Sequence, residues 1–271
     1  MALRPGGTWV RENGPVSLYR DDGIVLRTHK LGEADRIITI LTRRTGRVRA
    51  VAKGVRRTRS RFGARLEPFT HVDLLLYTGR SLDVITQAET VRPYGEPLAA
   101  DYPRYTSGTA MLEAAERFTP VEKEPSIRQF LLLVGGLRAL GEQAHDPRLV
   151  LDAYLLRTLA VAGYAPALDE CAVCGTPDPV ADPDAGSVAS TGSRVFSVPA
   201  GGLTCRTCRP PGAATPSVVT IALMRALLRG DWAHADASLP RPREECSGLV
   251  AAYVQWHLEH SIRSLRHVEH V

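Results

Sequence analysis

The first third of the chain alternates apolar and polar residues in short runs, and the remainder repeats apolar residues every three or four positions. Alternation is typical of strands with one buried face, whereas the longer period is typical of amphipathic helices. Before residue 91, glycines separate five β-rich runs, which cover residues 23–27, 36–41, 47–52, 72–77 and 82–86. Five short strands favour a small closed barrel. The oligonucleotide-binding (OB) fold is the commonest such barrel, although an SH3-like barrel would give a similar pattern.

From residue 94 the pattern changes to that of helices. Five helices are predicted, at residues 102–118, 126–140, 147–162, 217–228 and 245–266. Ser126 and Ser217 each follow a proline and suit the N-cap position, and Gly163 suits the end of the third helix. In the last helix the predicted buried stripe comprises Leu249, Ala252, Tyr253, Trp256, Ile262 and Leu265.

This change of pattern divides the chain into a leader and two domains. Residues 1–18 are rich in glycine and proline and lack the apolar core of a signal peptide, so we expect a flexible leader. Residues 19–93 would form the barrel and residues 94–271 the helical domain, with a cysteine-bearing insert at about residues 168–212. No segment reaches the roughly 18 consecutive apolar residues that span a bilayer. We therefore expect a cytoplasmic protein.

Basic residues are concentrated in one stretch of the predicted barrel. The 271-residue chain has a net charge of only +5, yet residues 43–65 contain no carboxylate. With Arg36 on the preceding strand, the predicted DNA-binding residues, called the basic cluster below, are Arg36, Arg43, Arg44, Arg47, Arg49, Lys53, Arg56, Arg57, Arg59, Arg61 and Arg65. Lysine and arginine release condensed counterions when they neutralise phosphates, and arginine contacts phosphate with two N–H groups. The stretch therefore predicts a polyanion-binding face.

Alternation within residues 47–52 indicates how this face would be presented. Val48 and Ala50 should point inward and Arg47 and Arg49 outward. Phe62 is the single aromatic residue of the basic stretch, so base stacking is a weaker expectation than phosphate binding. The alternatives are a solvated basic loop, a membrane surface or an acidic protein partner. No amphipathic basic helix or lipidation signal favours a membrane.

Four of the five cysteines form two pairs of identical spacing, Cys171 with Cys174 and Cys205 with Cys208. This spacing lets both thiolates of a pair reach one tetrahedral ion, and four thiolates leave no open coordination position. We therefore predict one structural Zn²⁺, with a [4Fe–4S] cluster as the alternative. The fifth cysteine, Cys246, is expected to be a small, partly buried residue.

No arrangement typical of a catalytic site is found in the sequence. It has no nucleophile elbow, phosphate-binding glycine loop or HExxH motif. Four histidines crowd the end of the last predicted helix, where we expect them to be solvated: His257, His260, His267 and His270. We therefore expect no enzymatic activity. The predicted fold class is α+β, with an OB-fold barrel followed by an α-helical domain that carries a zinc-binding insert.

Several motifs, in this order, resemble the RecO family. Residues 32–36 (Gly-Glu-Ala-Asp-Arg) are similar to the opening of the RecO barrel, and residues 52–57 (Ala-Lys-Gly-Val-Arg-Arg) to its most recognisable stretch. Residues 171–175 (Cys-Ala-Val-Cys-Gly) and 201–208 (Gly-Gly-Leu-Thr-Cys-Arg-Thr-Cys) resemble its zinc insert. The resemblance extends from about residue 19 to the C-terminus, and the composition looks actinobacterial.

This resemblance implies a function that composition alone does not give. RecO-family proteins bind single- and double-stranded DNA, anneal complementary strands and recognise the acidic C-terminal tail of the single-stranded DNA-binding protein. With RecR they help load RecA onto coated strands, so the resemblance implies these partners and a nucleoid-associated location. Candidate residues for tail binding in the helical domain are Arg128, Arg138, Arg148 and Arg157. The alternative function is that of a zinc-ribbon transcription or translation factor.

Overall fold

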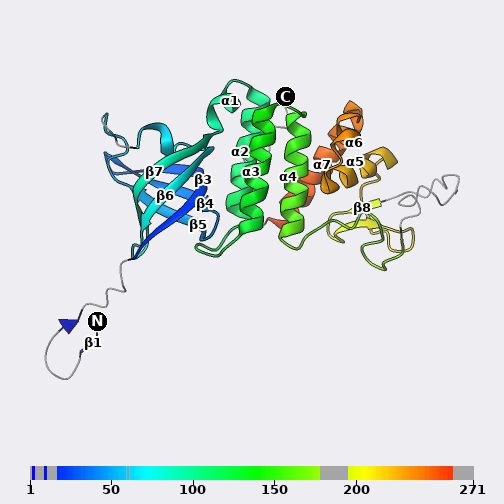
Figure 1. Ribbon diagram of the computed structural model, residues 1–271. Coiled ribbons are helices and arrows are strands. Elements are labelled where there is room, and N and C mark those ends of the chain that lie inside the picture. Colours follow the sequence, from blue (N-terminus) through cyan, green and yellow to red (C-terminus); the bar gives the residue numbers. More distant parts are fainter. Residues whose placement is uncertain are drawn as a thin grey trace. The chain divides into compact units, whose positions relative to one another are not determined.

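The computed structural model of the protein describes residues 2–3, 9–10, 17–58, 60, 62–177 and 195–258. Its chain forms two compact units (Figure 1). Unit 1 comprises Met1–Pro93 and Glu122–Pro125, and unit 2 comprises Tyr94–Val121 and Ser126–Val271. The segment Glu122–Pro125, called the Glu122 loop below, thus belongs to the first unit although it lies between two helices of the second.

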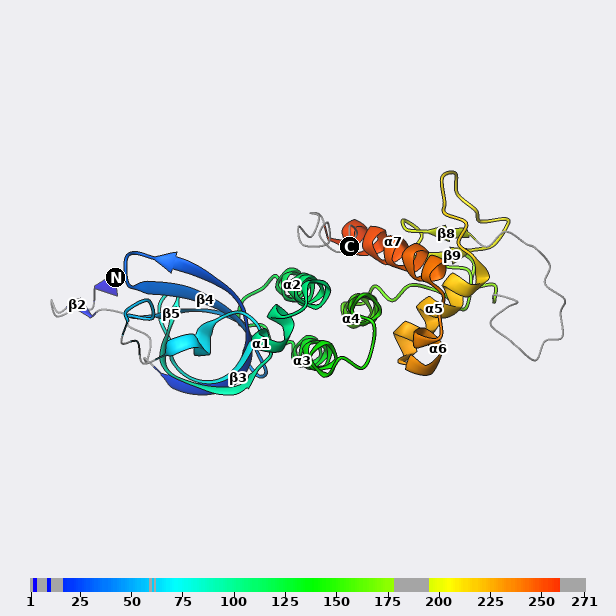
Figure 2. The same ribbon diagram turned by 90° about the horizontal axis from the view of Figure 1, so that it is seen from above.

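Unit 1 is built around a closed barrel of five strands. These are β3 (Leu18–Leu31), β4 (Asp35–Thr42), β5 (Gly46–Ala52), β6 (Thr70–Tyr77) and β7 (Asp83–Pro93). Around the barrel their order is β3-β4-β5-β7-β6, and β5 pairs with β7 in parallel, whereas the other paired strands are antiparallel. This is the Greek-key arrangement of the OB fold, which confirms the predicted barrel. Figure 2 shows β3, β4 and β5 curving around its interior.

Four of the five predicted strands lie within observed ones, and the fifth, residues 82–86, starts one residue before β7. Strand β3 is much longer than the predicted run. It has 14 residues, and one half pairs with β6 while the other pairs with β4. A bulge between Val25 and Arg27 interrupts the pairing with β4. Bulges bend a strand and increase its twist, which a small barrel needs in order to close. One long bent strand therefore joins two sides of the barrel.

The barrel core follows the alternation that the sequence predicted. Val48 and Ala50 of β5 are fully buried, as are Ile38 and Ile40 of β4. Phe62 also packs into this core, next to a short 3-10 helix, η1 (Gly63–Leu66), that lies between β5 and β6. The alternation on β5 leaves its arginines on the opposite, outward side.

Most of the predicted leader, residues 1–18, lies outside the described residues. Two short strands within it, β1 (Ala2–Leu3) and β2 (Trp9–Val10), pair with each other. Leu18 already belongs to β3, so the barrel begins one residue before the predicted boundary.

Unit 2 is helical throughout most of its described length. Its helices are α1 (Gly95–Ala99), α2 (Tyr102–Arg117), α3 (Ile127–Glu142), α4 (Pro147–Val161), α5 (Val218–Arg229), α6 (Trp232–Asp236) and α7 (Pro240–His257). Helices α2, α3 and α4 lie side by side and are seen end-on in Figure 2. Ser217 caps α5 through a bond from the Thr220 N–H, whereas Ser126 occupies the N-cap of α3 without such a side-chain bond. Helices α1 and α6 were not predicted, because five residues carry too little of the helical period.

The last predicted helix is wrong at both ends and on one face. Helix α7 begins at Pro240 instead of residue 245, and it ends at His257 instead of residue 266, because Leu258 has extended backbone angles. Two members of the predicted buried stripe, Ile262 and Leu265, lie outside the described residues. Two others, Ala252 and Trp256, are exposed, and 59% of the surface of Trp256 is accessible to solvent. The buried stripe is Cys246, Leu249, Val250, Tyr253 and Val254.

The observed buried stripe differs from the predicted one because its first residue is Cys246. Counted in steps of four from Cys246, the buried face passes through Val250 and Val254, and Trp256 falls outside it. Cys246 was expected to be a small, partly buried residue, and it is fully buried. His257 is not simply solvated as predicted, because it stacks on Tyr164 with ring centroids 4.4 Å apart. His260, His267 and His270 lie outside the described residues.

A short hairpin that the sequence did not predict lies beside the second cysteine pair. Its strands are β8 (Val195–Ser197) and β9 (Gly202–Thr204), and they pair in antiparallel fashion. Strands of three residues are too short to show alternation. Within the described residues, no helix is long and apolar enough to cross a membrane.

Candidate nucleic-acid interface and metal centre

The outward face of β5 presents two members of the basic cluster to a carboxylate. Arg49 Nε lies 2.5 Å from Glu122 Oε1, and Arg47 Nη1 lies 3.8 Å from the same oxygen. The side chain of Arg47 is 12% exposed and that of Arg49 46%. Both arginines point outward as predicted, but no pattern in the sequence indicated that Glu122, from a distant loop, would contact them.

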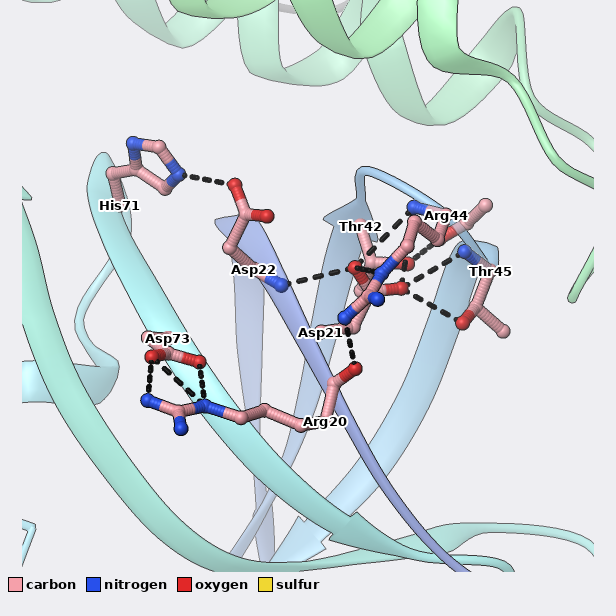
Figure 3. A network of polar contacts seen from close by, with 9 residues as sticks. Arg20, Asp21, Asp22, Thr42, Arg44, Thr45, His71 and Asp73 are labelled. Atoms are coloured by element: carbon pink, nitrogen blue, oxygen red, sulfur yellow. Dashed lines mark hydrogen bonds and ion pairs between the residues drawn. The ribbon is translucent and has the colours of Figure 1, made fainter.

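The turn between β4 and β5, which carries Arg43 and Arg44, is held by a buried carboxylate (Figure 3). Asp21 is 1% exposed. It accepts hydrogen bonds from the backbone N–H groups of Arg44 and Thr45 and from the Thr45 hydroxyl, at 3.2, 2.9 and 2.8 Å. The Arg44 guanidinium also turns back to this carboxylate. Arg43 donates its backbone N–H to the carbonyl of Asp22, while its side chain remains exposed.

Charges on the neighbouring strands β3 and β6 are paired with one another. Figure 3 shows the Arg20 guanidinium against Asp73 and His71 beside Asp22. Hydrogen bonding from Arg20 holds the pKa of Asp73 below its usual range. Local pairing on this side leaves the positive excess of the barrel on the side of β5 and its flanking turns.

The loop that follows β5 is tied to the β3–β4 hairpin. The Gly54 N–H donates to Asp35 Oδ1 at 2.7 Å, and the Arg56 N–H donates to the Ala34 carbonyl at 3.0 Å. The Arg56 guanidinium donates to the Glu33 carbonyl at 2.8 Å. Arg56 therefore has a structural role on the loop, whatever else it contacts.

The remaining members of the basic cluster differ in their surroundings. Arg36 pairs with Glu67, with Nη1 and Oε1 2.6 Å apart. Arg65 is exposed. Three members are exposed and form no ion pair with a described carboxylate: Arg43, Lys53 and Arg57. Two members lie outside the described residues: Arg59 and Arg61.

Phe62 does not supply a platform for bases, because it is 1% exposed within the barrel core. The surface formed by β5, the β4–β5 turn and the loop after β5 thus offers cations without an aromatic side chain from this stretch. Such a surface suits phosphate contacts, which carry no sequence information.

The four paired cysteines come together in unit 2. The Sγ atoms of Cys171, Cys174, Cys205 and Cys208 all lie within 4.8 Å of one another, and those of Cys174 and Cys205 are 3.8 Å apart. Zinc binds thiolates at about 2.3 Å, so the sulfurs of a tetrahedral site are about 3.8 Å apart. The cysteine cluster therefore has the size and donor set to hold a metal ion.

Backbone hydrogen bonds hold the first cysteine pair in this shape. Gly175 has a positive φ of 71°, and its N–H donates to the Cys171 carbonyl at 2.9 Å. The Ala172 N–H donates to the Leu203 carbonyl of β9 at 2.7 Å, which attaches the first pair to the hairpin before the second. The unpredicted hairpin is thus what brings the two pairs together.

Protonation within the cysteine cluster is uneven. Burial by itself raises the pKa of Cys171, but backbone N–H groups of Cys174, Cys205 and Val173 directed at the sulfur outweigh this and lower the pKa to about 6. Hydrogen bonding with Cys205 and Cys174 instead raises the pKa of Cys208 to about 12. Four thiolates this close repel one another unless a cation neutralises them, and metal binding is coupled to loss of the thiol protons.

Two arginines that sequence reasoning missed anchor the segment before Cys171. Arg225 Nε and Arg229 Nη2 of α5 lie 2.9 and 2.8 Å from the two oxygens of Asp169. Arg225 also donates to the Leu168 carbonyl. Their spacing of four residues placed them on one helix face, but nothing in the sequence identified Asp169 as their partner.

The four candidate residues for tail binding are not equivalent. Arg157 donates from Nε and Nη2 to the Leu227 carbonyl at 3.1 and 2.9 Å, near the end of α5. Arg138 pairs with Glu142 one turn further along α3, and Arg128 is exposed. Arg148 lies at the start of α4, half-buried. Arg157 is therefore partly engaged in packing the helices together.

Comparison with known proteins gives one consistent result over nearly the whole chain. Residues 16–94 match the family described as Recombination protein O N terminal, and residues 99–266 match Recombination protein O C terminal. The DNA repair protein RecO of Thermobifida fusca is 67% identical over 254 residues, covering 94% of this chain and 99% of that protein. RecO of Streptomyces griseus is 59% identical over 260 residues, covering 94% and 100%. RecO of a Nocardioides species is 60% identical over 252 residues, covering 93% and 99%.

Proposed function

The chain belongs to the RecO family of DNA repair proteins, and on that basis we propose that it is a non-enzymatic recombination mediator. It binds single- and double-stranded DNA and anneals complementary strands. With RecR it helps load RecA onto strands coated by the single-stranded DNA-binding protein, whose acidic C-terminal tail it recognises. Its place is the cytoplasm, in association with the nucleoid.

The basic cluster on the barrel is the observation that carries this proposal. Annealing brings two phosphate backbones close together, and a dense positive surface screens their repulsion. Arg43, Lys53 and Arg57 are exposed and form no described ion pair, so they are available to phosphates. The lack of an exposed aromatic residue in the stretch favours contacts that ignore base sequence.

We also propose that Cys171, Cys174, Cys205 and Cys208 hold one zinc ion. Sulfurs grouped within 4.8 Å fit a tetrahedral ion, and four thiolates would leave it no position for substrate. The ion would have a structural role, holding the cysteine pair before β8 and the pair after β9 together. An iron–sulfur cluster is the alternative occupant, and metal analysis with the absorption spectrum of the purified protein separates the two.

Strand annealing tests the proposed function. Two complementary labelled oligonucleotides are mixed with the full-length protein across a salt series without ATP, with and without bound single-stranded DNA-binding protein. We expect rapid annealing that persists on coated strands and weakens as salt rises. Binding that falls sharply when one sequence is scrambled would instead favour a zinc-ribbon transcription or translation factor. Metal-dependent cleavage of the strands would contradict a non-enzymatic role.

A further inference from the structure

A carboxylate from outside the basic cluster lies against two of its arginines. Glu122 Oε1 receives Arg49 Nε at 2.5 Å and lies 3.8 Å from Arg47 Nη1. The two arginines are 73 and 75 residues distant in the chain from this glutamate, so the contact depends on the fold and not on local sequence. All three residues belong to unit 1.

The Glu122 loop is held on the barrel by contacts that do not involve the Glu122 side chain. Lys123 Nζ lies 2.8 Å from Asp83 Oδ1, and Asp83 is fully buried. The Lys123 N–H donates to the Arg47 carbonyl at 2.9 Å. At Gly46 an added Cβ would lie 1.8 Å from the Glu124 carbonyl oxygen, so the two backbones are in close approach.

Backbone strain also indicates that the loop is fixed in place. Lys123 has a φ of 60°, in the left-handed region that residues other than glycine seldom occupy. Strain of this kind persists only where surrounding contacts determine the conformation. The Glu122 carboxylate is therefore delivered to the arginines by a rigid support and would remain nearby if its own ion pairs were broken.

A glutamate carboxylate and a backbone phosphodiester present the same features to arginine. Each carries one negative charge on two terminal oxygens, and each accepts charge-assisted hydrogen bonds from a guanidinium. The Glu122 carboxylate lies within ion-pair distance of both Arg49 and Arg47. Arg49 is still 46% exposed and can be reached from solvent.

We propose that Arg47 and Arg49 form a phosphate subsite in which Glu122 is a built-in competitor that a DNA phosphate replaces. This inference rests on the proposed function and adds a means of control to it. The competitor lowers the affinity of the subsite and lets a bound strand leave it easily, because the carboxylate neutralises the arginines as the phosphate departs. An annealing protein needs such release once the duplex has formed.

Glu122→Gln tests the inference, because it removes the charge and preserves the shape of the side chain. Binding of a labelled duplex of arbitrary sequence is measured by fluorescence anisotropy across a salt series. We expect binding about threefold to fivefold tighter at low salt, the range of an exposed ion pair. The salt slope should stay close to that of the unmodified protein, since the same phosphate is neutralised in both complexes. Glu142→Gln, which frees Arg138 on α3 in unit 2, is the control with the same change in net charge.

A double-mutant cycle identifies the partners of Glu122. In a background with Arg47 and Arg49 both changed to glutamine, the gain from Glu122→Gln should vanish. Melting curves of each variant verify folding, and Glu122→Ala serves as a second variant if the glutamine variant melts early.

Three outcomes would overturn the inference. If Glu122→Gln and Glu142→Gln raised the DNA affinity equally, the change in net charge alone would explain the effect. Weaker binding by Glu122→Gln would make Glu122 a positioning residue for Arg49. If the unmodified protein bound no DNA at low salt, the proposed function would itself fail, and the contact would be purely structural.

Discussion

Replacing Gly46 with alanine tests how firmly the Glu122 loop is held on the barrel. Gly46 has a φ of 85°, and a Cβ at this position would lie 1.8 Å from the Glu124 carbonyl oxygen. No side-chain rotation relieves a clash between two backbones, so Gly46→Ala has to displace the loop. Gly32 provides a matched control, because its φ is 58° and an added Cβ would meet nothing within 4 Å.

The two substitutions should differ by the energy of the loop contacts. A left-handed conformation costs an alanine about 1–2 kcal/mol, and the less flexible unfolded chain returns about 0.4–1 kcal/mol. Gly32→Ala should therefore destabilise by about 1 kcal/mol. Gly46→Ala also removes Lys123 from buried Asp83. Loss of one partner of a buried ion pair costs about 3–5 kcal/mol, here at the lower end because Asp83 keeps its bond from the Tyr19 hydroxyl. Together with about 1 kcal/mol for the left-handed backbone, this gives a total of about 4 kcal/mol.

Urea denaturation followed by far-ultraviolet circular dichroism gives the two free energies of unfolding. Hydrogen exchange of the β5 amides locates the change in the barrel, which matters because proteins with two compact units need not unfold in one step. If Gly46→Ala lost no more stability than Gly32→Ala, the close approach of the loop and its anchoring through Lys123 would both be refuted.

Three further predictions concern the metal, the DNA surface and pH. Cys171→Ser, or removal of metal with a chelator, should lower the melting temperature and the zinc content together; metal-free protein that melts unchanged would contradict a structural ion. Changing Arg43, Lys53 and Arg57 together to glutamine should weaken DNA binding equally across sequences and flatten the salt slope by up to about 0.9 per lost phosphate contact, measured by anisotropy. Burial raises the pKa of Asp152 to about 7, so the folded protein keeps a proton that the unfolded chain releases near pH 4. The free energy of unfolding that this carboxyl contributes therefore falls as pH rises from about 4 to about 7. The melting temperature of Asp152→Asn, relative to that of the unmodified protein, should rise between these pH values and stay constant below about pH 4.

The strands of the barrel could be predicted where side chains alternate, and were missed where polar contacts replace alternation. β5 alternates along its length and was found to within one residue. The first half of β3 contains Arg20, Asp21 and Asp22, a charged run that is depleted in strands. It is nevertheless a strand, because Arg20 pairs with Asp73 across the sheet and Asp21 is satisfied by the β4–β5 turn. Those partners lie far away in the chain, so a local pattern could not reveal them.

The candidate sites show the same division. The cysteine cluster could be found because each pair of ligands is local and only two pairs had to be brought together. Glu122 could not be found from any local pattern, because its role depends on a loop between two helices joining the other unit. Arg56 likewise belongs to the basic run in the sequence, but its guanidinium donates a hydrogen bond to the Glu33 carbonyl of the β3–β4 hairpin.

A count of charges along the sequence therefore overstates the number of cations that DNA can reach. The stretch itself has no carboxylate, yet the fold brings Asp21, Glu67 and Glu122 to four members of the basic cluster from distant segments. On the proposed function, each pairing would weaken one phosphate contact without removing the positive potential of the surface, because paired and exposed arginines still act at a distance of about one Debye length. Many weak contacts suit annealing better than a few strong ones, since two strands must be attracted, moved into register and then released. On the proposed function, the carboxylates on the barrel would lower the strength of DNA binding, and the exposed cations would attract the strands.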